Sequence, residues 1–260
     1  MNVKNLVNVM NFHALLRVDK AKREAEKYFE MEKTLREMID SITNNRNFAL
    51  DKRILRVPVD RPVLNIYVGS DLGFCGGYNF LVNEKAHKDK HSHKILIGRK
   101  LWHGIENVVM RLSQEEYEDY PKIVEDFITE SIKKGEYSEI NICYNSYVDI
   151  GTVHWLDKRL FPFEFDTDSS KYKEDFVCET NMNKLLLNMI TTYINFEIKL
   201  TAINSFAAEN IMRQNSTSES LKKIDAIEEE KQLAERKEKN EKEFQKIVES
   251  FTRMSHTGSR

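Results

Sequence analysis

The residues whose types and spacing could do chemistry gather in one glycine-rich stretch, Gly69–Asn79, which reads GSDLGFCGGYN. It follows an expected strand and precedes an expected helix, the position that nucleotide-binding loops occupy. Its spacing fits neither G-x-G-x-x-G nor G-x-x-x-x-G-K-[ST], so no lysine is placed for a terminal phosphate. Two interpretations follow: a phosphate cradle over Gly73–Gly77, or, favoured by the spacing, a tight turn with unusual backbone angles.

Cys75 lies within this stretch, just before a helix N-terminus that would lower the pKa of its thiol and make it a nucleophile. No pattern in the sequence ties a general base to it, which weakens that alternative. The three cysteines, Cys75, Cys143 and Cys178, are odd in number and lack C-x-x-C spacing. We therefore expect free thiols in a reducing cytosol.

Two other polar clusters resemble metal sites and fit them poorly. His87 and His91 have i,i+4 spacing, with His93 close by, but the neighbouring lysines disfavour a dication. The acidic segment 166–170 lacks the glycine and the twelfth-position glutamate of an EF-hand, which indicates a linker. We expect no metal, no cofactor and no catalytic residue.

Composition excludes several classes of partner. Forty basic and 42 acidic residues nearly cancel, so there is no overall field to attract nucleic acid or an anionic membrane. No apolar run approaches the roughly 20 residues of a membrane-spanning helix, and the first 20 residues lack the apolar core of a signal peptide. These features predict a cytoplasmic protein that binds a protein partner or a small ligand.

The elements that position the glycine-rich stretch are indicated by where helix breakers occur. All four prolines and eight of the nine glycines lie between residues 58 and 162, the ninth being Gly258 in a terminal Gly-Ser-Arg that is either native or an expression remnant. Residues 1–57 and 163–257 contain neither type, which predicts long uninterrupted helices at both ends. One helix from Asn181 to about Phe251 would be roughly 105 Å long.

Both terminal segments carry a seven-residue apolar repeat, which predicts a coiled-coil seam. In the C-terminal segment the two rows are Met182, Met189, Phe196 and Ile203, and Leu186, Tyr193, Leu200 and Ala207. In the N-terminal segment they are Ala21, Tyr28, Leu35 and Ile42, and Val18, Ala25 and Ile39, the second interrupted by Glu32. Because these segments flank the middle of the chain, the pair should be antiparallel. The alternative is two helices of an ordinary bundle, but no third amphipathic segment completes one.

The middle of the chain alternates strand and helix patterns, which predicts βαβ units and a small parallel sheet. The expected strands are 63–69, 94–98 and a segment containing Ile140, Ile142 and Tyr144, with 152–155 and 160–165 as edge pieces. The expected helices are 78–88, 99–107 and 113–135, the last opened by a capping box at Ser113 and Glu116. The predicted fold class is thus α/β plus a long antiparallel coiled coil, with helices at 1–57 and 171–260 and a Rossmann-like domain at 58–170.

Three segments together resemble the gamma subunit of F-type rotary ATPases, and the resemblance covers the whole chain. Residues 70–79 are similar to the family's S-D-x-G-L-C-G-G-x-N, with Leu72 and Phe74 as departures. The residues that carry this match are Asp71, Gly73, Cys75, Gly76, Gly77 and Asn79. Glu209 and Arg213 resemble S-E-x-x-x-R, and segments 233–237 and 243–248 resemble N-K-A-R-Q and E-L-T-E-I-V.

This resemblance implies a non-catalytic rotor shaft that couples ATP hydrolysis or synthesis in a catalytic alpha/beta hexamer to rotation. It also implies that Arg213, Arg236 and Glu243 contact the hexamer, and that the other partners are an epsilon-like subunit and a membrane rotor ring or its substitute. The complex would lie at the cytoplasmic face of a membrane, with no insertion of this chain.

Two departures leave alternatives open. Residues 7–16 match the family's N-terminal K-I-T-x-A-M-x-M-V-A poorly, and residues after Asn210 are unusually charged, with runs such as Glu228-Glu229-Glu230. They leave open a diverged F-type-like ATPase whose shaft drives a process other than proton pumping. From other classes, the chain would be a small nucleotide-binding enzyme that uses the Gly73–Gly77 loop, or a coiled-coil adaptor.

Overall fold

The computed structural model describes residues 3–45, 47, 60–149, 152–165, 177, 179 and 181–257. The chain divides into two compact units, Phe12–Ser216 and the pair of segments Met1–Asn11 and Thr217–Arg260. The acidic segment 166–170, Cys178 and the terminal residues 258–260 lie outside the described residues. The division into 1–57, 58–170 and 171–260 stays a prediction.

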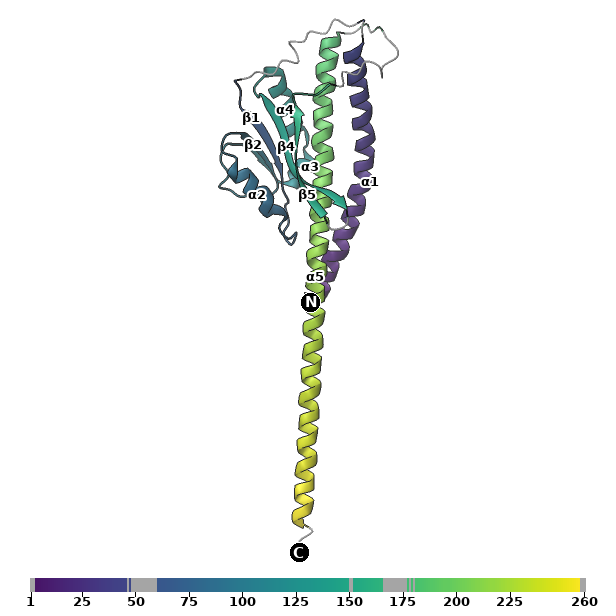
Figure 1. Cartoon of the computed structure of the whole chain (residues 1–260), viewed down its shortest axis with the longest axis vertical. Coiled ribbons are helices and arrows are strands. Elements are labelled where there is room, and N and C mark those ends of the chain that lie inside the picture. Colours follow the sequence, from purple (N-terminus) through teal and green to yellow (C-terminus); the bar gives the residue numbers. More distant parts are fainter. Residues whose placement is uncertain are drawn as a thin grey trace. The chain divides into compact units, whose positions relative to one another are not determined.

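Two long helices enclose an α/β domain in sequence, as predicted (Figure 1). The helices are α1 (Val3–Asn44), α2 (Tyr78–Lys88), α3 (Gln114–Asp119), α4 (Lys122–Lys134) and α5 (Met182–Thr257). The strands are β1 (Val63–Val68), β2 (His93–Ile97), β3 (Val108–Leu112), β4 (Glu139–Asp149) and β5 (Thr152–Phe161). With 76 residues and no glycine or proline, α5 is about 114 Å long at 1.5 Å per residue.

The five strands form one sheet in the order β3-β2-β1-β4-β5. The pairs β1·β2, β2·β3 and β1·β4 are parallel, and the edge strand β5 is antiparallel to β4. The predicted parallel sheet is therefore correct for β1–β4. The two edge pieces expected at 152–155 and 160–165 are one continuous strand, because the polar residues between them pair with β4 at the edge of the sheet.

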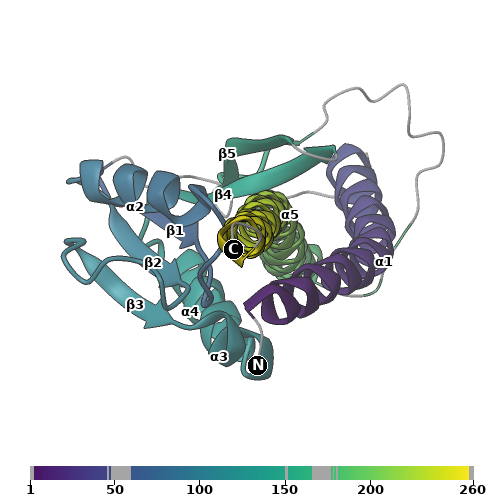
Figure 2. The same ribbon diagram turned by 90° about the horizontal axis from the view of Figure 1, so that it is seen from below.

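The sheet is covered on both faces (Figure 2). On one face, α2 packs through Val82 and Ala86 against Tyr67 and Leu96 of the sheet. On the other face lies a larger core to which α4, α5 and the end of α1 contribute, with Ile66 at the centre of the sheet. Strands buried on both faces read as continuous apolar runs, which explains why β1 and β2 were recognisable from sequence.

Within the unit 12–216, α1 and α5 pair antiparallel. Tyr28 stacks on Phe196 with ring centroids 5.9 Å apart, and Arg36 donates to the hydroxyl of Tyr193 over 3.3 Å. Moving along α1 from Tyr28 to Arg36, the partner on α5 moves back from Phe196 to Tyr193, as in an antiparallel pair. All the predicted seam positions in α1 are buried or half-buried.

The burial of α5 is wider than a two-row seam. Ile190, Ile194 and Ile198 lie outside the predicted rows, and all three are buried in the core beneath the sheet. In Figure 2, α5 lies between the sheet and α1, so it is covered on two sides. The heptad pattern identified the face toward α1 and missed the face toward the sheet.

Two helix predictions in the domain were wrong. No helix forms at 99–107; these residues make turns, and β3 follows at Val108. Segment 113–135 is two helices, because Pro121 begins a new helix and has no backbone N–H to continue the first. The capping box is confirmed: Ser113 accepts from the backbone of Glu116, whose carboxylate accepts from the backbone of Ser113.

The second unit contains the beginning of α1 and the last part of α5. Lys4 forms ion pairs of 2.7 Å with Asp225 and Glu228, and Asn11 donates to Ser218 over 2.7 Å. From Glu229 to Ser250 every residue of α5 is exposed. Among the described residues, no helix is long and apolar enough to cross a membrane.

Candidate functional site

The glycine-rich loop between β1 and α2 is held by its own side chains. Asn79, in the first turn of α2, accepts from the backbone N–H of Ser70 over 3.0 Å and donates to the Ser70 hydroxyl over 2.7 Å. The Ser70 hydroxyl in turn donates to the carbonyl of Leu72 over 2.8 Å, and Asn79 also contacts the Cys75 sulfur at 3.3 Å. Asn79 therefore fixes both ends of the loop.

Asp71 ties the loop to the adjacent edge of the sheet. Its carboxylate accepts backbone N–H bonds from Arg99 (2.8 Å), Gln114 (3.0 Å) and Glu115 (3.3 Å). Two of these donors are in the first turn of α3, whose unpaired N–H groups favour a carboxylate. Asp71 is thus a structural ligand of the domain's own backbone.

The tight turn with unusual backbone angles that the sequence predicted is present at Gly76. Its φ is +58°, and a Cβ there would lie 3.3 Å from the side chain of Met212 on α5. A β-carbon added at Gly73 or Gly77 would meet nothing within 4 Å. The neighbouring Phe74 also has a positive φ, +60°, and its side chain is exposed. The tight turn is therefore centred on Phe74–Gly76.

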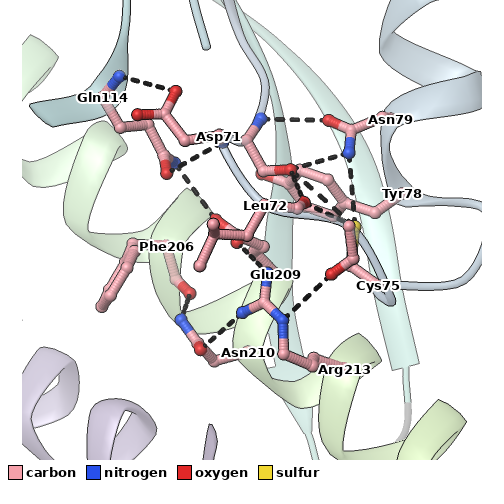
Figure 3. Close-up of polar contacts among 12 residues, drawn as sticks. Asp71, Leu72, Cys75, Tyr78, Asn79, Gln114, Phe206, Glu209, Asn210 and Arg213 are labelled. Carbon is pink, nitrogen blue, oxygen red and sulfur yellow. Dashed lines mark hydrogen bonds and ion pairs between the residues drawn. The ribbon is translucent and has the colours of Figure 1, made fainter. Parts of the chain in front are cut away.

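The loop docks onto α5 through a buried polar network (Figure 3). Arg213 donates through Nε to the carbonyl of Gly73 over 3.2 Å, through Nη1 to Asn210 over 2.8 Å, and through Nη2 to Glu209. Gln114 donates to Glu209 over 3.2 Å and to the carbonyl of Gly69 over 3.0 Å. The network connects β1, α3 and α5.

The charges in this network are almost completely removed from water. Glu209 is 1% exposed and Arg213 4% exposed. Burial raises the pKa of Glu209, whereas Arg213 and Gln114 favour its ionised form. Removing one partner of such a buried pair strongly destabilises the folded state, because the remaining charge is left buried without an opposite charge beside it.

Apolar and hydroxyl contacts complete the junction. Cys75 and Tyr78 pack against Ala208 of α5. The Tyr78 hydroxyl bonds to the hydroxyl of Ser205 and donates to its carbonyl over 3.1 Å. Asn145 on β4 donates to the carbonyl of Tyr78 over 3.1 Å. The glycine-rich loop is thus the surface by which the domain is attached to the helix.

These contacts weigh against the loop as a catalytic site. Cys75 is buried, and burial raises the pKa of its thiol, with a hydrogen bond between Cys75 and Ser70 opposing that rise. A thiol in such surroundings is a poor nucleophile. Among the described residues, no group of three or more His, Cys, Asp or Glu side chains is arranged to hold a metal ion.

The three residues predicted to contact a partner lie in different environments. Arg213 is buried within this chain, where its guanidinium is engaged by the loop and by α5 itself. Arg236 and Glu243 belong to the other unit and are fully on the surface of α5. A partner contact by any of the three stays a prediction.

Sequence reasoning missed Gln114, Ser205 and Asn210. A signal was available for Asn210: with Glu209 it interrupts the apolar residues around it, a pattern that marks a paired polar group on a buried helix face. No such signal exists for Gln114, which is an ordinary residue in the first turn of α3. Its role depends on the packing of β1, α3 and α5.

A family model described as ATP synthase matches residues 1–249. The chain belongs to the ATP synthase family. The match to the family model extends through both units and along most of the exposed end of α5. The match therefore does not rest on the glycine-rich loop alone.

Curated relatives within the ATP synthase family are named ATP synthase gamma chain. The protein of Clostridium perfringens (strain SM101 / Type A) is 22% identical over 243 residues, covering 87% of this chain and 83% of the relative. That of Mycoplasma mycoides subsp. mycoides is 24% identical over 236 residues, covering 83% and 81%. Such identities are low, and the similarity extends along most of each chain.

Solved structures share the fold. A chain in the central stalk and c-ring structure of the Tetrahymena thermophila mitochondrial ATP synthase has a TM-score of 0.56 at 13% identity, covering 83% of this chain and 99% of that one. A chain in the OSCP/F1/c-ring structure of the Euglena gracilis enzyme has a TM-score of 0.52 at 11% identity, with 97% coverage of both. The predicted arrangement of an α/β domain between long helices is confirmed.

Proposed function

We propose that this chain is the gamma subunit of an F-type ATP synthase: the central shaft whose rotation couples a catalytic alpha/beta hexamer to the rest of the complex. Membership of the ATP synthase family and the likeness to central-stalk chains support this function. The order of elements, helix, α/β domain and long helix, supports it as well.

The observation that carries the proposal is the exposed end of α5. Residues 229–250 are exposed on every side, and the exposed residues include Leu233, Phe244, Ile247 and Val248. Much of the stability of a helix in a protein comes from packing an apolar face, and nothing in the described part of this unit covers these side chains. A surrounding sleeve of partner subunits would cover them.

A shaft in a sleeve transmits force through contacts that differ among its orientations. A rotor can bias three catalytic sites only if it contacts each of them differently, since equal contacts shift no equilibrium. Exposed charges such as Arg236 and Glu243 suit this role, because surface ion pairs are individually weak and can be broken and remade. The shaft itself needs no catalytic group.

Three further features belong to the proposal. The chain is non-catalytic, because the loop that could bind nucleotide is occupied by contacts to α5. Its other partners are an epsilon-like subunit and a membrane rotor ring or a substitute for it. It lies on the cytoplasmic side, peripheral to the membrane, and it binds no nucleic acid.

A second candidate is the shaft of a diverged F-type-like ATPase that drives a process other than proton pumping. The observation that favours it is the N-terminal segment 7–16, which departs from the family's usual motif. This candidate shares the hexamer and differs in what is attached at the other end of the shaft.

The test is purification of the chain from its own cell with its complex intact. Subunit masses and ATPase activity should show one copy of this chain with a hexamer of larger nucleotide-binding subunits. A proton-translocating ring in the same complex would favour the first candidate over the second. If the chain runs alone and binds nucleotide saturably, the proposal fails and the loop must be considered an active site.

A further inference from the structure

A cavity of about 350 Å³ lies where α1, α5, α3 and the sheet meet, within the unit 12–216. Its walls include Val68 and Ile97, the last residues of β1 and β2, and Ala202 and Phe206 of α5. Small-molecule sites have volumes of about 300–1,000 Å³. In parallel sheets they form at the carboxyl ends of the strands, the location of this cavity.

Basic side chains line the same cavity. Arg17 and Lys20 of α1 and Lys199 of α5 are all part of its wall. Among the described residues, Arg17 and Lys20 form no ion pair, and Lys199 lies 4.8 Å over the ring of Tyr28. The three cations are therefore not neutralised by direct carboxylate partners.

Two carboxylates, Glu24 and Glu118, also line the cavity, so its charge is modestly positive. Burial raises the pKa of Glu118, with Lys20 opposing and Glu24 adding to the rise. The wall thus combines apolar surface from the sheet and α5 with a basic rim from α1. That combination fits a molecule with an apolar body and one acidic group.

We propose that this cavity binds a small amphiphilic anion, its apolar or aromatic body against Ala202 and Phe206 and its acidic group held by Arg17 and Lys20. Lys199 supplies a third positive charge from α5. Such a ligand bridges α1, α5 and the sheet, so its binding stabilises the packing of α1. The cavity adjoins the loop junction, because Gln114 lines both, and ligand binding there does not depend on rotation.

The probe is 8-anilinonaphthalene-1-sulfonate, an aromatic sulfonate whose fluorescence rises in apolar surroundings, titrated into the full chain. We expect saturable binding at one site. N-phenyl-1-naphthylamine, which lacks the sulfonate, should bind about tenfold more weakly, the effect of losing a charge-assisted hydrogen bond.

The decisive variant is Arg17→Gln with Lys20→Gln, which changes two exposed residues and leaves the core intact. It should weaken sulfonate binding by about tenfold and leave the neutral probe unchanged. The matched control is Lys122→Gln with Lys133→Gln, which removes the same charge from exposed positions of α4 and should change neither probe.

A cavity-filling variant, Ala202→Met, gives an independent measurement, because it should weaken both probes. Equal weakening by the α1 and α4 double variants would assign the effect to overall charge and overturn the proposal. Binding at several equivalent sites, unchanged in every variant, would overturn it as well. Either result leaves the proposed shaft function untouched, since that function is tested by the composition of the complex.

Discussion

The two lengths of α5 are parts of one helix and are stabilised in opposite ways. In residues 182–216, apolar side chains pack against both α1 and the sheet, and polar residues such as Glu209 and Arg213 are paired within the chain. In residues 229–250 every side chain is exposed, and charged residues pair only along the helix, as Lys242 does with Glu238. The first length is held by contacts within the chain, and the second is exposed.

The comparison teaches that similar residues have different roles on the same helix. Arg213 and Arg236 are both arginines that resemble positions of one family pattern, yet only Arg213 is buried. Substituting the first should affect folding, and substituting the second should affect coupling. The following predictions test that division, from the largest expected effect to the smallest.

The largest effect should come from Arg213→Ala. We expect the free energy of unfolding to fall by about 3–5 kcal/mol, because Glu209 is left as an unpaired buried charge. Urea unfolding of the isolated chain, followed by circular dichroism, measures this. Arg236→Ala is the matched control and should change stability by less than about 0.5 kcal/mol. Equal effects of the two substitutions would remove the distinction between the two lengths.

The next effect concerns the docking of the loop on α5. Gly76→Ala should destabilise the chain by roughly 1–2 kcal/mol, because the backbone at +58° is strained for any residue with a β-carbon and Met212 is close. Gly77→Ala, where a β-carbon meets open space, serves as the control. If both variants lose a similar amount of stability, the positive φ of Gly76 is not the cause of the loss.

A smaller effect is expected at Glu32, the residue that interrupts the α1 seam. Burial, together with a hydrogen bond to Glu197, raises the pKa of Glu32; Tyr193 and Lys158 oppose the rise. Glu197 itself is 1% exposed and bonded to Tyr193 (2.8 Å) and Lys158 (2.7 Å). The native state therefore favours the protonated form of Glu32.

The sign of the pH dependence follows. A carboxyl with a raised native pKa contributes its full stability below its unfolded pKa of about 4.3 and loses it as the pH rises through the native value. Glu32→Gln keeps the neutral form at every pH, so it should raise Tm by about 2 °C at pH 7, and the gain should vanish below about pH 4. Glu37→Gln, at an exposed position of α1, is the control. A gain in Tm that persists unchanged below about pH 4 would rule out the raised pKa of Glu32 as its cause.

The smallest effect on the isolated chain should come from Arg236→Ala combined with Glu243→Ala. Both residues are exposed, so unfolding should shift by less than about 0.5 kcal/mol. In the assembled complex the same double variant should lower coupled ATP turnover modestly, because weak contacts with the sleeve are lost. Unchanged torque and turnover would end the assignment of these residues as partner contacts.

Several elements could be predicted because their signals are local. The absence of glycine and proline predicted that α1 and α5 are long, although α1 ends at Asn44, well before the first proline. Glycine and apolar runs marked β1 and β2, and a capping box placed the start of α3. The glycine-rich loop was found in the same way, and its spacing already argued against a phosphate site. These features depend on residues near one another in sequence.

Other features were decided only by tertiary structure. Whether Arg213 faces a partner or its own domain depends on where the loop meets α5, 140 residues away in sequence, and no local pattern encodes that distance. The same holds for β3, whose apolar residues become an edge strand through pairing with β2, and for Gln114, which acquires its role from three elements at once. The sequence by itself determined that both terminal segments form long helices and that strands and helices alternate between them. Burial, the choice of partner for each polar group and the cavity beside α1 arose when those helices packed on the sheet, because the free energy of a buried charge depends on neighbours that only the fold supplies.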